Sequence, residues 1–253
     1  GVNGNGYRES NNGNDIDDVI LKTHWAPTDV DEFWLNFHYY DGRADMPGGL
    51  TQAQYDSNPY QSLRDYDYFA GRRKDVSFKW QRQLDDATQF EVLTYYTDSF
   101  RGSAIASRDM KTLSSYPRNY HTFAIEPRLS RIFFAGPTTQ EVSVGYRYLK
   151  EAMREQSTRL ALIDNVPTPT PTSDGHVFQD RSGGTEASAY YIDDKIDVGN
   201  WTITPGIRFE HINTDWRDRP VMDANYRPVP EKNRSITSNE PLPALSVMYH
   251  LSD

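Results

Sequence analysis

The chain has 253 residues, enough for one large domain or two small ones. Its net charge of −9 and isoelectric point near 5.2 argue against a general nucleic-acid-binding protein. It contains no cysteine, which excludes disulfides and thiolate metal sites, and no apolar run approaches the ~18 residues of a membrane-spanning helix. A membrane β-barrel is compatible with the mean hydropathy of −0.79, because only alternate residues of its strands meet lipid.

Alternation of apolar and polar residues with period 2 predicts nine β-strands. In chain order they lie near residues 16–25, 33–40, 76–81, 90–96, 121–129, 142–148, 184–196, 201–214 and 245–251. Short polar turns separate the first two strands and each following pair, at 26–29, 84–87, 135–138 and 197–200. The sequence therefore predicts an all-β protein built from consecutive hairpins.

The hairpin over residues 184–214 shows the alternation most clearly. Trp201, Ile203 and Phe209 share one face of its second strand, whereas Arg208 and Glu210 lie on the other. One face of a soluble sheet can have this character. The wall of an outer-membrane barrel has it too, with lipid outside and water inside.

The connections between strands alternate between short and long. The long segments run over about 41–73, 101–119, 156–184 and 215–241, and the Pro-Thr run 167–171 predicts an extended, unpaired loop tip. Short turns at one end and long loops at the other are the rule in outer-membrane barrels, whereas loops of 20 residues are uncommon in compact soluble domains. Because bacterial single-chain barrels usually have an even number of strands, nine strands predict part of a larger barrel.

No catalytic signature is present, which argues against an enzyme. HExxH, GxSxG, Walker and dinucleotide-binding patterns are all missing from the sequence. The six histidines lack close pairing, so no metal site is predicted.

Arginines at the loop ends are the more informative charges. Arg101 ends the fourth strand and Arg118 precedes the fifth, so one loop joins them and both guanidiniums can lie at one rim. Arginine binds carboxylates in bidentate geometry, and converging arginines would suit a multiply anionic ligand. The competing interpretation is that they pair with local Asp and Glu or are solvated. The basic run 72–74 lies at another junction, where a solvated rim is the simpler interpretation.

Several longer sequence segments resemble those of a known family. They are YYDGRADMPGGL (39–50), AGRRK (70–74), PRNY (117–120), IEPRLS (125–130), EVSVGYRYL (141–149), DDKIDVGNWTITPGIRFEHI (193–212) and LPALSVMYH (242–250). In this collinear order the chain resembles the ferric dicitrate transporters, the FecA family of TonB-dependent outer-membrane receptors.

The resemblance implies an antiparallel transmembrane β-barrel of 22 strands closed by an N-terminal plug. Residues 1–253 would form about nine strands of that one barrel domain, roughly the fourth to the twelfth, without the plug or the C-terminal strands. It further implies a Gram-negative outer-membrane location, contact with lipid and lipopolysaccharide, and energy from the TonB-ExbB-ExbD system through the N-terminal part. No cofactor is expected, since iron is carried as the ferric dicitrate ligand.

Three arginines are implied to hold the citrate carboxylates. Arg101 and Arg118 match the family positions directly, and Arg181 is the nearest candidate for a third arginine before the word GTEA, where the spacing differs by an insertion. Two alternatives remain open at this point. One is a TonB-dependent receptor for another siderophore, and the other is a soluble β-sheet binding protein.

Overall fold

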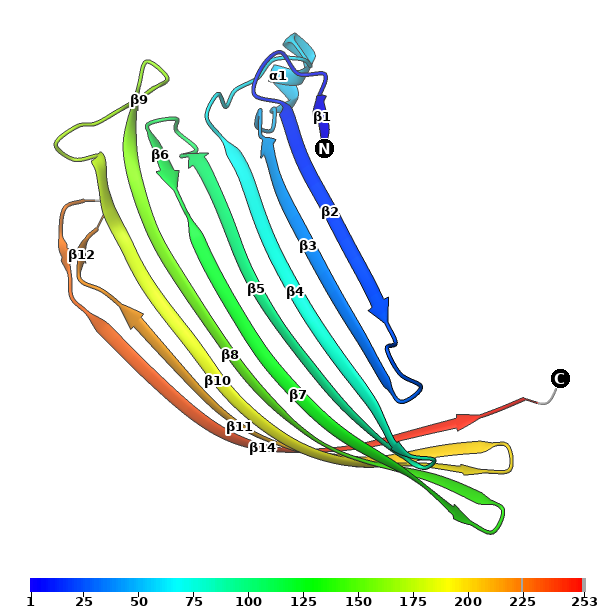
Figure 1. Cartoon of the computed structure of the whole chain (residues 1–253). Coiled ribbons are helices and arrows are strands. Elements are labelled where there is room, and N and C mark those ends of the chain that lie inside the picture. The colour runs from blue at the N-terminus through cyan, green and yellow to red at the C-terminus, as the bar shows by residue number, and fades with distance from the viewer. Residues whose placement is uncertain (224, 252–253) are drawn as a thin grey trace.

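The computed structural model describes residues 1–223 and 225–251, and the side chains of residues 2 and 5 also lie outside the description. The domain prediction extends over 224 and 252–253, which are outside the described residues. The described chain forms one large, curved antiparallel sheet that is a single layer thick (Figure 1). This arrangement confirms the predicted antiparallel barrel architecture.

Nine long strands make up most of the sheet, as the alternation predicted, and three short strands bring its total to twelve among the described residues. The long strands are β2 (Gly13–Trp25), β3 (Asp31–Asp45), β4 (Tyr68–Asp85), β5 (Thr88–Ala106), β7 (Arg118–Ala135), β8 (Thr138–Ile163), β10 (Asp174–Val198), β11 (Trp201–Asp218) and β14 (Lys232–Tyr249). Each pairs with the next long strand along the chain. All nine exceed the ~9–11 residues that cross a bilayer, so the wall continues beyond the thickness of a membrane.

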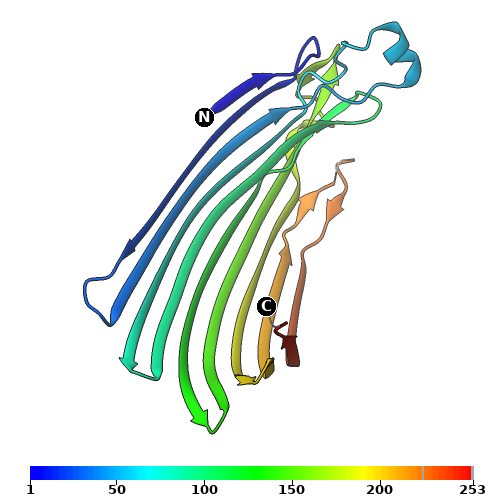
Figure 2. The ribbon, with the colours of Figure 1, turned by 90° about the vertical axis from the view of Figure 1, so that its right-hand side faces the viewer.

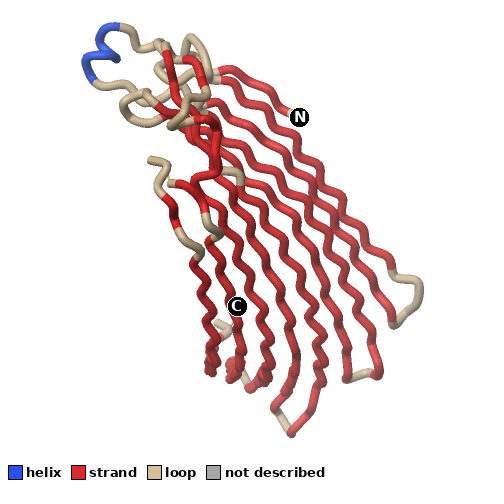
Figure 3. Tube along the Cα trace, turned by 90° about the vertical axis from the view of Figure 1, so that its left-hand side faces the viewer, coloured by secondary structure: helices blue, strands red, loops and turns tan. Residues whose placement is uncertain are grey.

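The two ends of the sheet differ, as Figures 2 and 3 show. One end carries the short turns 26–30, 86–87, 136–137 and 199–200, and the other carries the long connections 46–67, 107–117, 164–173 and 219–231. The long connections are shorter than predicted because the strands extend into them. At this end lie the small elements β1 (Val2–Asn5), α1 (Gln52–Ser57), β6 (Thr112–Ser115), β9 (Val166–Thr168), β12 (Val221–Met222) and β13 (Pro228–Val229).

The Pro-Thr run departs from its predicted unpaired conformation. Its first residues form β9, which pairs with the end of β8 through Ile163↔Val166 and Leu162↔Pro167. Asp164 and Asn165 both have positive φ, 50° and 62°, as a two-residue hairpin turn requires. Pro167 is tolerated because an edge strand leaves one side of its backbone without a partner.

The two faces of the sheet have opposite chemistry. On the convex face, cross-strand neighbours such as Ile192↔Ile207 and Leu35↔Phe78 build a continuous apolar band, and Ile207 is 50% exposed. The other face carries ion pairs, with Lys79 Nζ 3.0 Å from Glu91 Oε2. Similar inward pairs are Arg147 with Glu126 and Arg208 with Glu210. Successive residues of the long strands therefore point in turn to the apolar face and to the ionic face.

A compact soluble sandwich is incompatible with this structure. Among the described residues, the buried hydrophobic side chains are Ala104, Ala106, Ala124, Leu162 and Ala189. The accessible surface is 15944 Å², whereas a globular protein of 29.1 kDa exposes about 11,000 Å². The apolar band must therefore be covered by something outside the chain, as the hydrocarbon of a bilayer covers a barrel wall.

No helix in the described part of the chain is long and apolar enough to cross a membrane.

We expect Ile207→Lys, in the middle of the apolar band, to destabilise the folded wall in lipid by about 2–4 kcal/mol, the cost of a cation at the bilayer midplane. Thr204→Lys on the inward face of the same strand is the matched control and should be nearly neutral. Both can be measured as the denaturant midpoint of the barrel in lipid vesicles. Equal effects of the two substitutions would contradict the assignment of the faces.

Candidate ligand site at the mouth of the wall

The strand register brings the three predicted site arginines into one row. Arg101 on β5 lies opposite Arg118 on β7, which lies opposite Glu155 on β8. Glu155 is in turn opposite Arg181 on β10, and Arg181 is opposite Asp218 on β11. Three strand steps of about 4.8 Å separate Arg101 from Arg181, or roughly 14 Å. That span is too wide for one carboxylate and suits a ligand that carries several.

The whole row faces the ionic, inward side of the wall. Tyr95 is an inward residue, because its hydroxyl accepts a hydrogen bond from Arg147 at 2.9 Å. Arg101 follows it on β5 by an even number of residues and so shares its face. Residues directly opposite in an antiparallel pair point to the same side, which places Arg118 and Arg181 inward as well.

Arg118 is held by a buried carboxylate. Its Nη2 lies 3.2 Å from Glu155 Oε1, and the Glu155 side chain is only 3% exposed. The same oxygen accepts a hydrogen bond from Ser157 Oγ at 3.2 Å. The hydrogen bond to Glu155 raises the pKa of Arg118 above its usual value, so the guanidinium stays charged. Arg118 Nε is buried and has no hydrogen-bond partner among the described atoms.

Arg181 has a similar partner on the next strand. Its Nε lies 3.1 Å from Asp218 Oδ1, and the indole Nε1 of Trp216 donates a hydrogen bond to the same oxygen at 3.1 Å. Gly183 makes room for that indole, since a Cβ there would come within 2.6 Å of Trp216 Cε3. Asp218 therefore fixes both the arginine and the tryptophan at the foot of the connection 219–231.

Arg101 differs from Arg118 and Arg181 in its contacts, because it packs on an aromatic ring. Its guanidinium carbon lies 5.3 Å from the centre of the Phe69 ring, a cation–π distance. In the described part of the chain it makes no ion pair within 4.0 Å. Local pairing thus accounts for Arg118 and Arg181, as the competing interpretation expected, but leaves Arg101 available.

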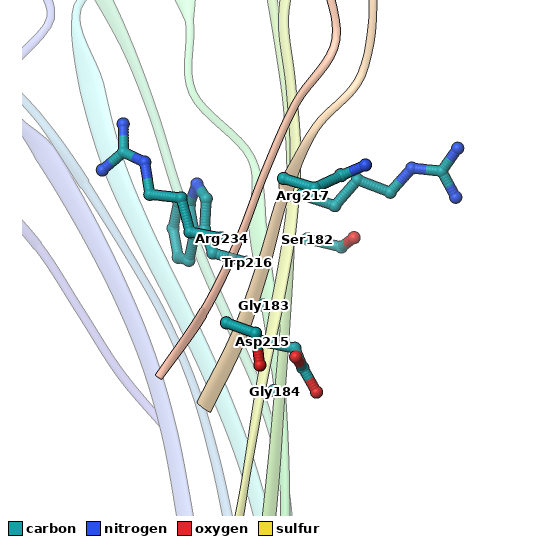
Figure 4. A pocket seen from close by; sticks show the side chains of 9 residues that line it. Ser182, Gly183, Gly184, Asp215, Trp216, Arg217 and Arg234 are labelled. Atoms are coloured by element: carbon teal, nitrogen blue, oxygen red, sulfur yellow. The ribbon is translucent and has the colours of Figure 1, made fainter. Parts of the chain in front are cut away.

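Glycines open a hollow of about 510 Å³ beside Trp216 (Figure 4). Trp216 and Arg234 lie on one side of the strands, and Arg217 and Ser182 lie on the other. The hollow is therefore not one chamber, and its inner side is formed by Trp216, Arg234 and the backbone of Gly183.

Glu155 and Asp218 were not identified from the sequence as partners of the arginines, although the positions of the turns could have shown them. Arg118 and Glu155 are equidistant from the two-residue turn 136–137, and Arg181 and Asp218 are equidistant from the turn 199–200. In a hairpin without a bulge, equal distance from the turn places two residues opposite each other. In the residues described, no group of three His, Asp or Glu side chains is arranged to hold a metal ion.

Comparison with known proteins places this wall in a family. Residues 23–253 match the family described as TonB dependent receptor-like, beta-barrel. The chain belongs to the TonB-dependent receptor family. Members of this family are outer-membrane transporters and not enzymes.

Solved structures agree with this assignment. The ferric citrate transporter FecA in its unliganded form is 42% identical, with a TM-score of 0.84 over 98% of this chain and 35% of that one. The receptor chain thus spans about a third of that protein's length. The ferric-catecholate import receptor Fiu of E. coli K12, in its open form, is 12% identical with a TM-score of 0.74, over 99% and 47%. The ferric yersiniabactin uptake receptor FyuA of Yersinia pestis is 14% identical with a TM-score of 0.68, over 100% and 38%. The last two comparisons show the fold alone.

We expect Glu155→Ala to lower the free energy of unfolding of the receptor by about 1–3 kcal/mol, because it strips a partly buried guanidinium of its charged partner. Glu151→Ala is the matched control, since Glu151 is an exposed inward residue of the same strand. Denaturant unfolding in lipid vesicles measures both. A loss no larger for Glu155→Ala than for the control would show that the pair contributes nothing.

Proposed function

We propose that the chain is part of an outer-membrane receptor that imports iron as a ferric citrate complex. In this proposal Arg101, Arg118 and Arg181 bind the citrate carboxylates on the inner face of the barrel mouth. Iron enters as the transported ligand and not as a resident cofactor. Energy would come from the TonB-ExbB-ExbD system through a part of the receptor outside this chain, and the apolar band would lie against outer-membrane lipid and lipopolysaccharide.

The observation that carries the proposal is the inward arginine row. A citrate complex of ferric iron presents several carboxylates, and guanidiniums spaced over roughly 14 Å can bind more than one of them. The lack of an ion pair at Arg101 leaves its guanidinium donors available for an anion. The identity of 42% with a ferric citrate transporter supports this ligand over other iron chelates.

We expect Arg101→Ala or Arg118→Ala to weaken ferric citrate binding by the complete receptor by about 1.5–3 kcal/mol, the value of a charge-assisted hydrogen bond. Arg181→Ala should have a similar effect. The control is Arg217→Ala, because Arg217 lies on the other face of the sheet and pairs with Glu231 at 2.7 Å. Equilibrium binding of radiolabelled ferric citrate measures all four.

The iron chelate itself is tested by uptake. Cells whose only ferric-chelate receptor contains this chain should take up iron from ferric citrate in preference to catecholate or hydroxamate chelates. Preferential uptake of either other class would contradict citrate as the ligand while leaving the transporter class intact. Unchanged affinity in all three arginine variants would instead remove their assigned role.

A further inference from the structure

Next to Arg101, the two residues that continue its row across the inner wall are glycines. Gly42 on β3 lies opposite Gly71 on β4, and Gly71 lies opposite Arg101 on β5, so two glycines continue the arginine row. A Cβ built on Gly71 would have no atom closer than 3.9 Å. The backbone at Gly71 is therefore open to the barrel interior, and glycine within a strand often marks a site where another group approaches closely.

Aromatic rings border this open backbone. The Tyr40 ring lies along the wall over Gly42, where a Cβ would collide with the Tyr40 hydroxyl. Phe69 borders Gly71 on the other side, beneath the guanidinium of Arg101. The result is a hollow of about 350 Å³, here called the Gly71 bay. Tyr40, Gly71, Arg73, Ser99, Arg101 and Tyr120 line it on the inner face, and Arg72 and Phe100 border it on the outer face.

A second arginine faces the same hollow. Arg73 is two residues after Gly71 on β4 and lies opposite Ser99, so it points inward and is a diagonal neighbour of Arg101. Its Nε lies 2.5 Å from Asp75 Oδ2, and its side chain is 58% exposed. Asp75 also accepts a hydrogen bond from Thr97 at 2.6 Å. A guanidinium has five N–H donors, so Arg73 can keep this pair and still bind an anion.

We infer that the Gly71 bay is a carboxylate-binding station on the path of the ferric citrate complex, with Arg73 as an additional ligand-binding residue and Gly71 as the residue that makes room. This inference rests on the proposed function. Arg118 and Arg181 already pair with Glu155 and Asp218, whereas Arg101 has no such competitor. An entering anion therefore binds first where no ion pair has to be broken, and the bay places Arg73 beside that point.

The first test is charge removal on the two faces of one strand. Arg73→Gln in the complete receptor should weaken equilibrium binding of ferric citrate about ten-fold or more, because a charge-assisted contact is lost. Lys74→Gln is the matched control. Lys74 is the following residue on β4, faces outward and does not line the hollow, so this substitution should leave the affinity unchanged.

The second test fills the bay without touching a charge. Gly71→Leu should also weaken binding about ten-fold, since the leucine occupies the space beside Arg101, whereas Ala70→Leu on the outer face should not. Weaker binding in both Arg73→Gln and Gly71→Leu, with unchanged controls, supports the bay. A loss in Arg73→Gln alone would overturn it, because Arg73 would then act only through Asp75. Wild-type affinity in both would also overturn it.

The wild-type receptor separates this inference from the proposed function. Failure of the wild type to bind ferric citrate removes the proposed function and the bay's assignment together. Binding by the wild type with no effect of either substitution removes only the bay. Heat-resistant electrophoretic mobility of each variant barrel verifies that the protein measured is folded.

Discussion

The side-chain period of two, carried in one register across nine long strands, is the constraint on which the structure depends. The apolar band decides which residues of each strand face outward, and the alternation then decides which arginines face inward. A slip of one residue in any strand would expose its apolar set to water and send its arginine to the lipid side. Arg101, Arg118 and Arg181 are separated by up to 80 positions in sequence, yet they share a row because hydrophobic residues elsewhere fix the register.

Counter-charges decide what such a row can bind. Burying a lone carboxylate like Glu155 is costly, but between two arginines in register it is neutralised, and it keeps Arg118 in place without ligand. A ligand that displaces Glu155 or Asp218 exchanges one ion pair for another, so a single carboxylate gains little. A polyanion that also engages Arg101, which has no counter-charge to give up, gains more. The pairing therefore favours ligands with several negative groups.

The strands were predictable because every one repeats the alternation over many residues. Small elements such as β6 and β9 were not, since three or four residues carry too little pattern. The Arg118–Glu155 and Arg181–Asp218 oppositions were missed, although equal distance from a tight turn would have predicted both. The opposition of Arg101 and Arg118 did not follow in this way, because their strands meet across the connection 107–117, whose irregular path sets no register.

The position of the paired residues links the row to the loops above it. Arg118 follows the connection 107–117, and Asp218 precedes the connection 219–231, where the Arg219 amide donates to the Asp180 carbonyl at 2.8 Å. Removing Arg181 from Asp218 would leave that carboxylate with Trp216 as its hydrogen-bond donor at the base of a loop. A ligand can shift loop conformations only by the difference in its interactions with them. If a ligand carboxylate replaced Glu155 or Asp218 as the partner of its arginine, the ion pair at the base of a loop would change. The ligand would then interact differently with different conformations of that loop.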